Sequence, residues 1–407
     1  MKNTGLTGNN RQALLLYIST VAGLGLSFVA SIVNTRALPS AEYGDVRYVQ
    51  NISQFISWIC LFGFFLSGSR MLALSDNKER SRRIRGCLIL VLLVCSAALM
   101  SVMAVCSLLY NPAMRRLMLL SLPVCAYPLL LNYMNTTPQG DNHIGRIAIA
   151  RLLPVLLYIP AAYFIFRHHG ATSLSMILLQ WGIYSAVLVC VILSTGPSFR
   201  KLRGTFVELN AENRTYGIHL YTGSLAMVAT TYLAGVTLGA FNSDNTQVAY
   251  YTLALTLTSP LAYLPGIVGT AYFRKFANEP RIPTGVFRLT ILMTICSCIL
   301  FVLLIKPLVL FFYPEEYSCV AKYAMWMCVG FCLHGMGDML NRFLCSHGRG
   351  VEIRNSSFLC GLVKIVGFTL LVWLWNVNGA LVTNVLASSV YLLALAHYYR
   401  KFVSDKQ

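Results

Sequence analysis

Apolar stretches long enough to cross a bilayer recur along the chain from residue 13 to residue 399. A membrane-spanning helix needs about 20 apolar residues, and each break between the stretches carries charge, proline or glycine. Only 11% of the residues are charged, whereas a soluble domain has roughly 25%. The pattern therefore predicts an all-α integral membrane protein with twelve transmembrane helices, at residues 13–34, 48–74, 86–109, 116–134, 147–167, 172–195, 219–240, 248–272, 286–311, 319–341, 356–375 and 379–399.

Lysine and arginine gather in alternate connections between these runs, and basic connections stay on the cytoplasmic side of a membrane. Both termini are therefore expected in the cytoplasm. The net charge of +18 then follows mainly from topology, and we do not expect nucleic-acid binding, which needs a basic face on a water-exposed domain. The cytoplasmic set comprises Lys2, Arg11, Lys78, Arg80, Arg82, Arg83, Arg85, Arg146, Arg200, Lys201, Arg203, Arg214, Arg274, Lys275, Arg281, Arg342, Arg349, Arg354, Arg400, Lys401 and Lys406.

The longest connection falls in the middle of the chain and divides the runs six and six. We expect an N-terminal six-helix bundle at 1–195, a cytoplasmic linker at 196–218 and a C-terminal six-helix bundle at 219–407. The halves also look like copies, since Gly140-x5-Arg146 in the first matches Gly348-x5-Arg354 in the second. Six spans per copy give both copies the same orientation, as in transporters that work by alternating access.

A charged hairpin, Ser31–Asn51, separates the first two runs and is expected to turn at a membrane surface. Its sequence NTRALPSAEYGDVRYVQ, followed by LFGFFLSGSRMLA and a basic loop, resembles the opening of bacterial polysaccharide exporters. The resemblance is to the O-antigen flippases of the Wzx type, which share a superfamily with MATE multidrug exporters and lipid II flippases.

That resemblance implies a MATE-like fold in which two six-helix bundles form a V. It also implies a substrate, an oligosaccharide repeat unit linked through pyrophosphate to undecaprenol, moved from the inner to the outer leaflet of the bacterial cytoplasmic membrane. The expected partners are this lipid-linked oligosaccharide, the membrane, and the polymerase and chain-length regulator of the same pathway.

An anionic pyrophosphate crossing a low-dielectric region needs fixed positive charge inside the protein. Lys364 is the strongest candidate because it lies about 12 Å along the helix axis from the start of its run. Arg151, in the matching part of the first half, is paired with it as a hypothesis. Arg146 and Arg354 could receive the incoming pyrophosphate or serve as positive-inside anchors. The basic residues at other span ends are further candidates for binding the substrate, namely Arg36, Arg70 and Arg288. The alternative for these three residues is that they anchor helix ends at the membrane interface.

One carboxylate, Asp338, lies within an apolar run. His334 and Arg342 stand four residues before and after it, so the three share one helix face. A buried carboxyl beside an imidazole suits a proton-coupled step. The alternative is an Asp338–Arg342 ion pair that closes the cytoplasmic end of the helix.

Several other functions lack their motifs. No glycine precedes a lysine, so the phosphate-binding Gly-x4-Gly-Lys loop is absent, and no Gly-x-Ser-x-Gly elbow occurs. The cysteines lie mostly in apolar runs as small buried side chains, so neither a metal nor a cofactor is expected. We predict a transporter and not an enzyme. The alternatives are an O-antigen polymerase or ligase, which would carry a long periplasmic loop, and a MATE-like exporter of small cations, which would favour acidic residues in its cavity.

Overall fold

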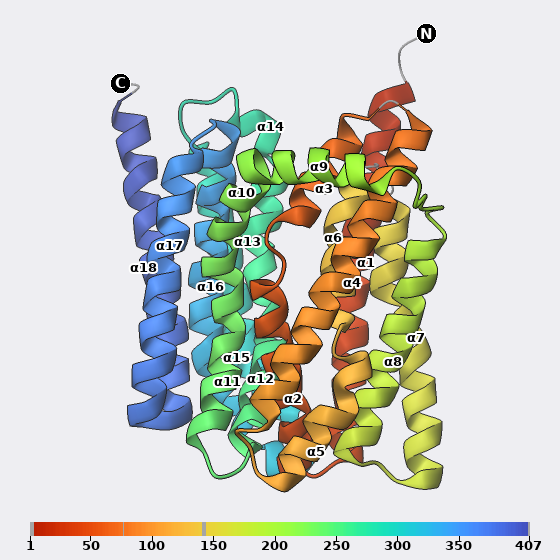
Figure 1. The fold of residues 1–407 in the computed structure, drawn as a ribbon. Helices are drawn as coiled ribbons and strands as arrows, with labels where there is room; N and C mark the ends of the chain where they lie inside the picture. Colours follow the sequence, from red (N-terminus) through yellow and green to blue (C-terminus); the bar gives the residue numbers. More distant parts are fainter. Residues whose placement is uncertain (1–3, 76, 141–143, 406–407) are drawn as a thin grey trace. The chain divides into compact units, whose positions relative to one another are not determined.

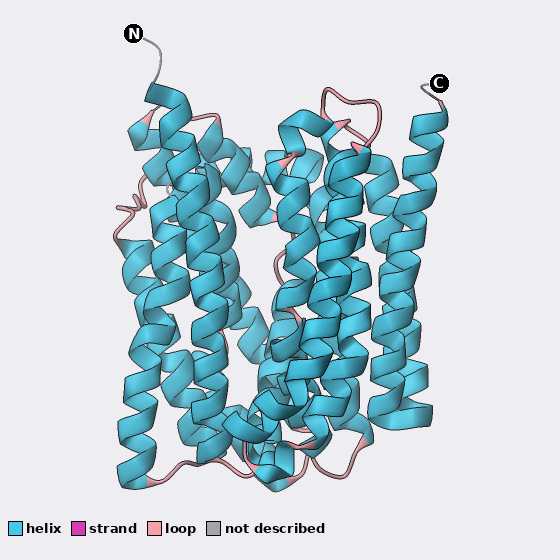
Figure 2. Cartoon of the chain, turned by 180° about the vertical axis from the view of Figure 1, so that it is seen from behind, coloured by secondary structure: helices cyan, strands magenta, loops and turns pink. Residues whose placement is uncertain are grey.

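The computed structural model describes residues 4–75, 77–140 and 144–405. Lys2 and Lys406 of the predicted cytoplasmic set lie outside these residues. Figure 2 shows helices joined by short loops, and no strand occurs in the described ranges. The predicted all-α fold class is therefore confirmed.

The chain folds as two compact units. The first comprises Met1–Glu42 and Val49–Leu225, and the second comprises Tyr43–Tyr48 and Ala226–Gln407. Much of the predicted linker is helical, and it packs within the first unit. The division into bundles at 1–195 and 219–407 stays a prediction.

Helices of the first unit begin where the sequence offers caps for their unpaired N–H groups. The Asn77 side chain accepts a hydrogen bond from the Glu79 backbone N–H, and the Asn111 side chain accepts one from the Met114 N–H. The elements are α1 (Thr4–Ala37), α2 (Ser40–Ile59), α3 (Phe64–Ala73), α4 (Lys78–Ser107), α5 (Pro112–Ser121), η1 (Leu122–Val124), α6 (Tyr127–Gly140), α7 (Ile144–His169), α8 (Ser173–Leu193), α9 (Leu202–Glu212), η2 (Asn213–Gly217) and α10 (Ile218–Ser224).

The second unit is built around a core of aromatic and aliphatic side chains that includes Phe343, Tyr391 and Leu395, all fully buried. The helices α17 and α18 run side by side in it, blue in Figure 1. Its elements are η3 (Leu225–Ala229), α11 (Thr230–Phe241), α12 (Thr246–Thr258), α13 (Pro260–Ala271), α14 (Phe273–Phe276), α15 (Thr284–Phe312), η4 (Glu315–Tyr317), α16 (Cys319–Ser346), α17 (Gly350–Val366), η5 (Gly367–Leu371) and α18 (Val372–Ser404).

Eight helices of the described residues are long and apolar enough to cross a membrane, or nine if the bent pair α2 and α3 forms one span. One of the eight, Gly350–Ser404, merges two predicted spans across Asn376, whose backbone (φ 53°, ψ −134°) is not helical. The predicted spans 13–34 and 219–240 coincide with α1 and with the stretch from α10 to α11, which are not among the eight. The protein is thus a multi-pass membrane protein, and the count of twelve stays a prediction.

The segment Tyr43–Tyr48 of α2 belongs to the second unit, although the rest of α2 belongs to the first. It comes so close to the start of α12 that a Cβ atom at Gly44 would lie 2.0 Å from the Asn245 carbonyl oxygen. The Asn245 amide donates a hydrogen bond of 2.7 Å to the Asp45 carboxylate. The charged hairpin of the sequence is therefore a packed structural element, and not a loop that only turns at the surface.

Candidate functional site

Lys364 lies inside the second unit, with 9% of its surface exposed. Its ammonium group donates a hydrogen bond of 3.2 Å to the Thr231 hydroxyl on α11. The contact depends on Gly361, because a Cβ atom there would lie 2.4 Å from the Ala226 carbonyl oxygen in η3. A glycine one turn before the lysine thus lets α17 approach η3 and α11 closely enough for the bond to form.

Arg151 lies half-buried in the first unit, on α7. Its guanidinium donates to the Thr20 hydroxyl of α1 at 3.0 Å and to the Asn135 side-chain oxygen of α6 at 3.1 and 3.2 Å. The side chain is therefore held toward α1 and α6, within its own unit.

The two basic residues lie at corresponding places in the two halves and each has a threonine partner. Each lies on the fifth predicted span of its half and donates to a threonine on the first span of the same half. The separations along the sequence agree closely, 364 − 151 = 213 for the cations and 231 − 20 = 211 for the threonines. Each unit thus contains one cation that donates a hydrogen bond to a threonine hydroxyl.

A polar network surrounds Asp338 on α16. The buried Tyr391 of α18 donates a hydrogen bond of 3.1 Å to its carboxylate, and Tyr391 in turn accepts one of 2.8 Å from the Asn341 amide. The His334 ring stacks on the Tyr391 ring at 4.7 Å between centroids. Lys364 also lies close enough to interact electrostatically with the Asp338 carboxylate. The structure therefore brings Asp338, His334 and Lys364 into one neighbourhood.

Arg342, the third residue of the predicted coupling group, lies one turn after Asp338 on α16, and its side chain is exposed. Its stem packs on α13, where the Cβ and Cγ atoms lie 3.1 Å from the position of a Cβ atom at Gly269. None of the ion pairs within the described residues joins Arg342 to Asp338. The carboxylate is instead held by Tyr391 and the arginine by the helix surface of α13.

The remaining candidate arginines lie at or near helix ends. Arg70 forms an ion pair of 2.8 Å with Glu212 and lies over the Tyr216 ring. Arg146 is half-buried in the first turn of α7. The others are exposed near the ends of α1, α15 and α17, namely Arg36, Arg288 and Arg354.

Three cysteines of the second unit bring their sulfur atoms within 4.8 Å of one another, namely Cys298, Cys328 and Cys332. Thiolates of this kind suit soft metal ions, and the sequence did not indicate that these three residues meet. They pack against apolar neighbours such as Leu261 and Phe331, which is also the surrounding expected for small buried side chains.

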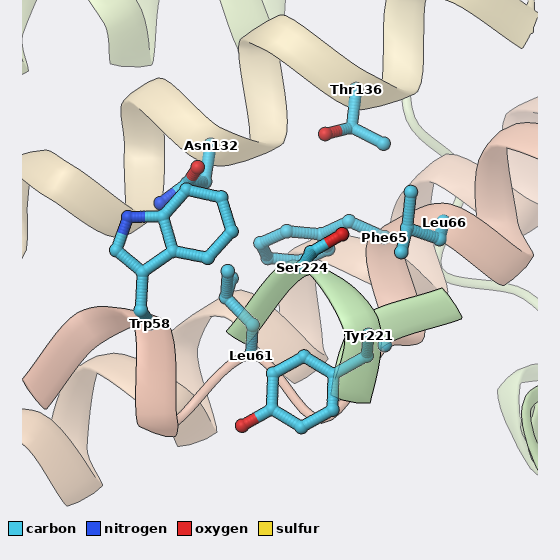
Figure 3. Close-up of a pocket in the computed structure, with 9 residues that line it drawn as sticks. Trp58, Leu61, Phe65, Leu66, Asn132, Thr136, Tyr221 and Ser224 are labelled. Carbon is cyan, nitrogen blue, oxygen red and sulfur yellow. The ribbon is translucent and has the colours of Figure 1, made fainter. Parts of the chain in front are cut away.

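A cavity of about 90 Å³ lies in the first unit where the second span is broken. The helices α2 and α3 meet there at a bend of 60°, and Phe62 and Gly63 take left-handed backbone angles (φ 47° and 79°). Figure 3 shows the side chains that surround the cavity. Its lining residues are Trp58, Leu61, Gly63, Phe65, Leu66, Asn132, Thr136, Tyr221 and Ser224.

The broken backbone is satisfied from the segment that follows α9. The Tyr221 hydroxyl donates to the Ile59 carbonyl at 2.8 Å, and the Asn213 amide donates to the Phe62 carbonyl at 2.9 Å. Carbonyl groups freed inside a membrane need such partners. Sequence reasoning missed this break, although Gly63 in the middle of the predicted span 48–74 was a signal for it.

Solved structures of similar fold are membrane transporters. The chain superposes on the lipid II flippase MurJ in an inward closed conformation with a TM-score of 0.75 at 12% identity, covering 96% of this chain and 89% of that one. An inward-facing multidrug resistance MATE family transporter of the MOP superfamily gives 0.69 at 13% identity, with 94% and 96% covered. A MOP superfamily transporter from Pyrococcus furiosus gives 0.63 at 14%, with 97% and 95% covered. These matches confirm the predicted MATE-like fold.

Sequence comparison identifies the family. No curated protein matches the chain. A family model described as polysaccharide biosynthesis protein matches residues 10–273, which is more than half of the chain. The match agrees with the resemblance carried by the charged hairpin and the basic loop after it. The chain therefore belongs to the polysaccharide biosynthesis protein family.

Proposed function

We propose that this protein is a flippase for undecaprenyl-pyrophosphate-linked O-antigen repeat units. It moves them by alternating access from the inner to the outer leaflet of the bacterial cytoplasmic membrane, with both termini in the cytoplasm. The observation that carries the proposal is the matched pair of cations, Arg151 held by Thr20 and Lys364 held by Thr231.

A basic residue at the centre of a membrane-spanning helix costs about 2.5–3.5 kcal/mol on insertion scales, so Lys364, eight residues into its predicted span, needs a compensating role. A pyrophosphate supplies it, because the anion itself requires a cation wherever water is scarce. The helices that carry Lys364 and Thr231 also adjoin π-helical turns, η5 and η3, and such turns are frequent at functional sites.

Deleting the gene tests the proposal against its two rivals. For a flippase, single lipid-linked repeat units should build up in the inner leaflet, where a membrane-impermeant glycosidase added outside the cells does not reach them. Unpolymerised units capping the outer-leaflet product would instead indicate a polymerase or ligase. An unchanged lipid-linked pool together with increased sensitivity to cationic drugs would indicate a MATE-like exporter.

We also propose that Asp338 couples transport to an ion gradient, with His334 and Tyr391 beside it and Arg342 at the end of the network. A carboxyl that is buried, bonded to a tyrosine and close to Lys364 changes its interaction with that cation when it gains or loses a proton. Such a change alters the positive charge that is available to the substrate.

Asp338→Asn is expected to slow transport about tenfold, within the 5–150-fold range of coupling free energies of about 1–3 kcal/mol. The residual transport should no longer respond when the proton gradient is collapsed, because an amide does not titrate. Export is measured in deletion cells carrying each variant, with and without a protonophore. The exposed Asp405→Asn serves as the matched control. Unchanged export and unchanged gradient dependence in Asp338→Asn would exclude the coupling role.

A further inference from the structure

We propose that the cavity at the broken second span is a subsite for one sugar ring of the lipid-linked substrate. This inference rests on the proposed function and adds to it the place where the protein contacts carbohydrate. All residues that line the cavity belong to the first unit.

The lining of the cavity combines an aromatic face with polar groups. In Figure 3 the Asn132 amide lies beside the Trp58 indole, and the Thr136 hydroxyl faces the same space. Within the described part of the chain, neither the Asn132 amide nor the Thr136 hydroxyl has a protein hydrogen-bond partner. An aromatic wall with a few convergent polar groups is the usual composition of a small-molecule site. A sugar ring complements it, since its C–H face covers the indole and its hydroxyls bond to amide and hydroxyl groups.

The size of the cavity limits what it holds. A cavity of about 90 Å³ has room for roughly six to nine water-sized groups at 10–15 Å³ each. That is comparable to the atoms of one sugar ring and is too small for a whole oligosaccharide. We therefore infer that a single residue of the repeat unit enters, and that the remaining sugars stay outside.

The cavity also lies beside a candidate pyrophosphate ligand. The helix α6 carries Asn132 and Thr136 at the cavity, and between them Asn135, which holds the Arg151 guanidinium. Three residues of helix rise by about 4.5 Å. A pyrophosphate bound at Arg151 therefore has its first attached sugar within reach of Asn132.

The cavity is a built feature of the fold. Discontinuous helices form the substrate sites of many transporters. Here Gly63 approaches η2 so closely that a Cβ atom on it would lie 2.6 Å from the Gly217 backbone. Asn213 bonds to the Phe62 carbonyl and also accepts a hydrogen bond from Ser67 at 3.0 Å. These contacts fix the bend and hold Trp58 at the cavity.

The test measures binding to the purified full chain in nanodiscs with two probes. The first is the pool of undecaprenyl-pyrophosphate-linked sugars extracted from cells of the source strain that lack this gene. The second is the same pool after mild acid has cleaved the sugar–pyrophosphate bond, which leaves undecaprenyl pyrophosphate. We expect Trp58→Ala and Asn132→Leu each to weaken binding of the sugar-carrying probe about tenfold, because hydrogen bonds and packing to the sugar are lost. The same variants should change binding of undecaprenyl pyrophosphate less than about twofold.

Control variants separate the subsite from the proposed function. Trp58→Phe keeps an aromatic face and should retain most of the binding, and Trp373→Ala, at an indole that is 65% exposed on α18, should change neither probe. Arg151→Gln should weaken both probes. Equal effects of Trp58→Ala on the two probes, or no effect on either, would overturn the sugar subsite alone. A wild-type protein that binds neither probe would overturn the proposed function together with it.

Discussion

Replacing Lys364 by glutamine is expected to reduce export of the lipid-linked unit at least about thirtyfold. The substrate pyrophosphate would lose its cationic partner, and removing one member of a buried charge pair costs about 2–5 kcal/mol. The lysine lies within the second unit and is held toward α11 by Thr231. Glutamine fills much of the same space and can still bond to the threonine, so the variant removes the charge and little else. Export is measured as surface polysaccharide and as inner-leaflet lipid-linked units in deletion cells.

Two further variants make this result specific. Lys364→Arg keeps the charge and should retain more export than Lys364→Gln. Thr231→Val removes only the hydroxyl that positions the ammonium, and one such hydrogen bond contributes about 0.5–1.5 kcal/mol, so we expect a loss of about three- to tenfold. Lys322→Gln, at an exposed lysine of α16, controls for loss of positive charge. Export at the wild-type rate in Lys364→Gln would rule out the pyrophosphate role of this residue.

The fold class could be predicted from the sequence because bilayer thickness sets the length of an apolar run. The breaks inside the runs could not be predicted in the same way. The run 48–74 is apolar on both sides of its break, and its bend depends on Tyr221 and Asn213, which are remote in the sequence. The break at Asn376, by contrast, falls between the predicted spans 356–375 and 379–399 and was predicted from the sequence.

The charged residues of the site could be predicted from the sequence, but the neutral residues that bind them could not. Lys364 and Arg151 stood out because a cation in an apolar run is rare. Thr20 and Thr231 did not, since threonine is ordinary in membrane helices. His334 and Asp338 could be grouped by their spacing of four residues. Their partner Tyr391 lies on another helix, and only the packing of α16 against α18 brings it to the carboxylate.

Gly44→Ala is expected to destabilise the second unit by about 3 kcal/mol, at the upper end of the range for overpacked sites. Its Cβ atom would lie 2.0 Å from the Asn245 carbonyl oxygen, and a backbone atom cannot rotate away as a side chain can. To relieve the overlap, the segment Tyr43–Tyr48 must move away from Asn245, and the hydrogen bond between Asp45 and that residue is lost with it. Reversible unfolding in detergent measures the change in stability.

The matched control is Gly25→Ala, at a glycine of α1 where an added Cβ atom meets nothing within 4 Å, and there we expect no loss. Asp45→Ala removes the hydrogen bond without the steric overlap and should cost about 1–3 kcal/mol, the penalty for leaving a polar partner unsatisfied. The order Gly44→Ala, Asp45→Ala, Gly25→Ala in decreasing effect therefore separates close packing from the hydrogen bond. Equal stability of Gly44→Ala and Gly25→Ala would show that the hairpin does not pack on α12, and the segment Tyr43–Tyr48 would then belong with the rest of α2.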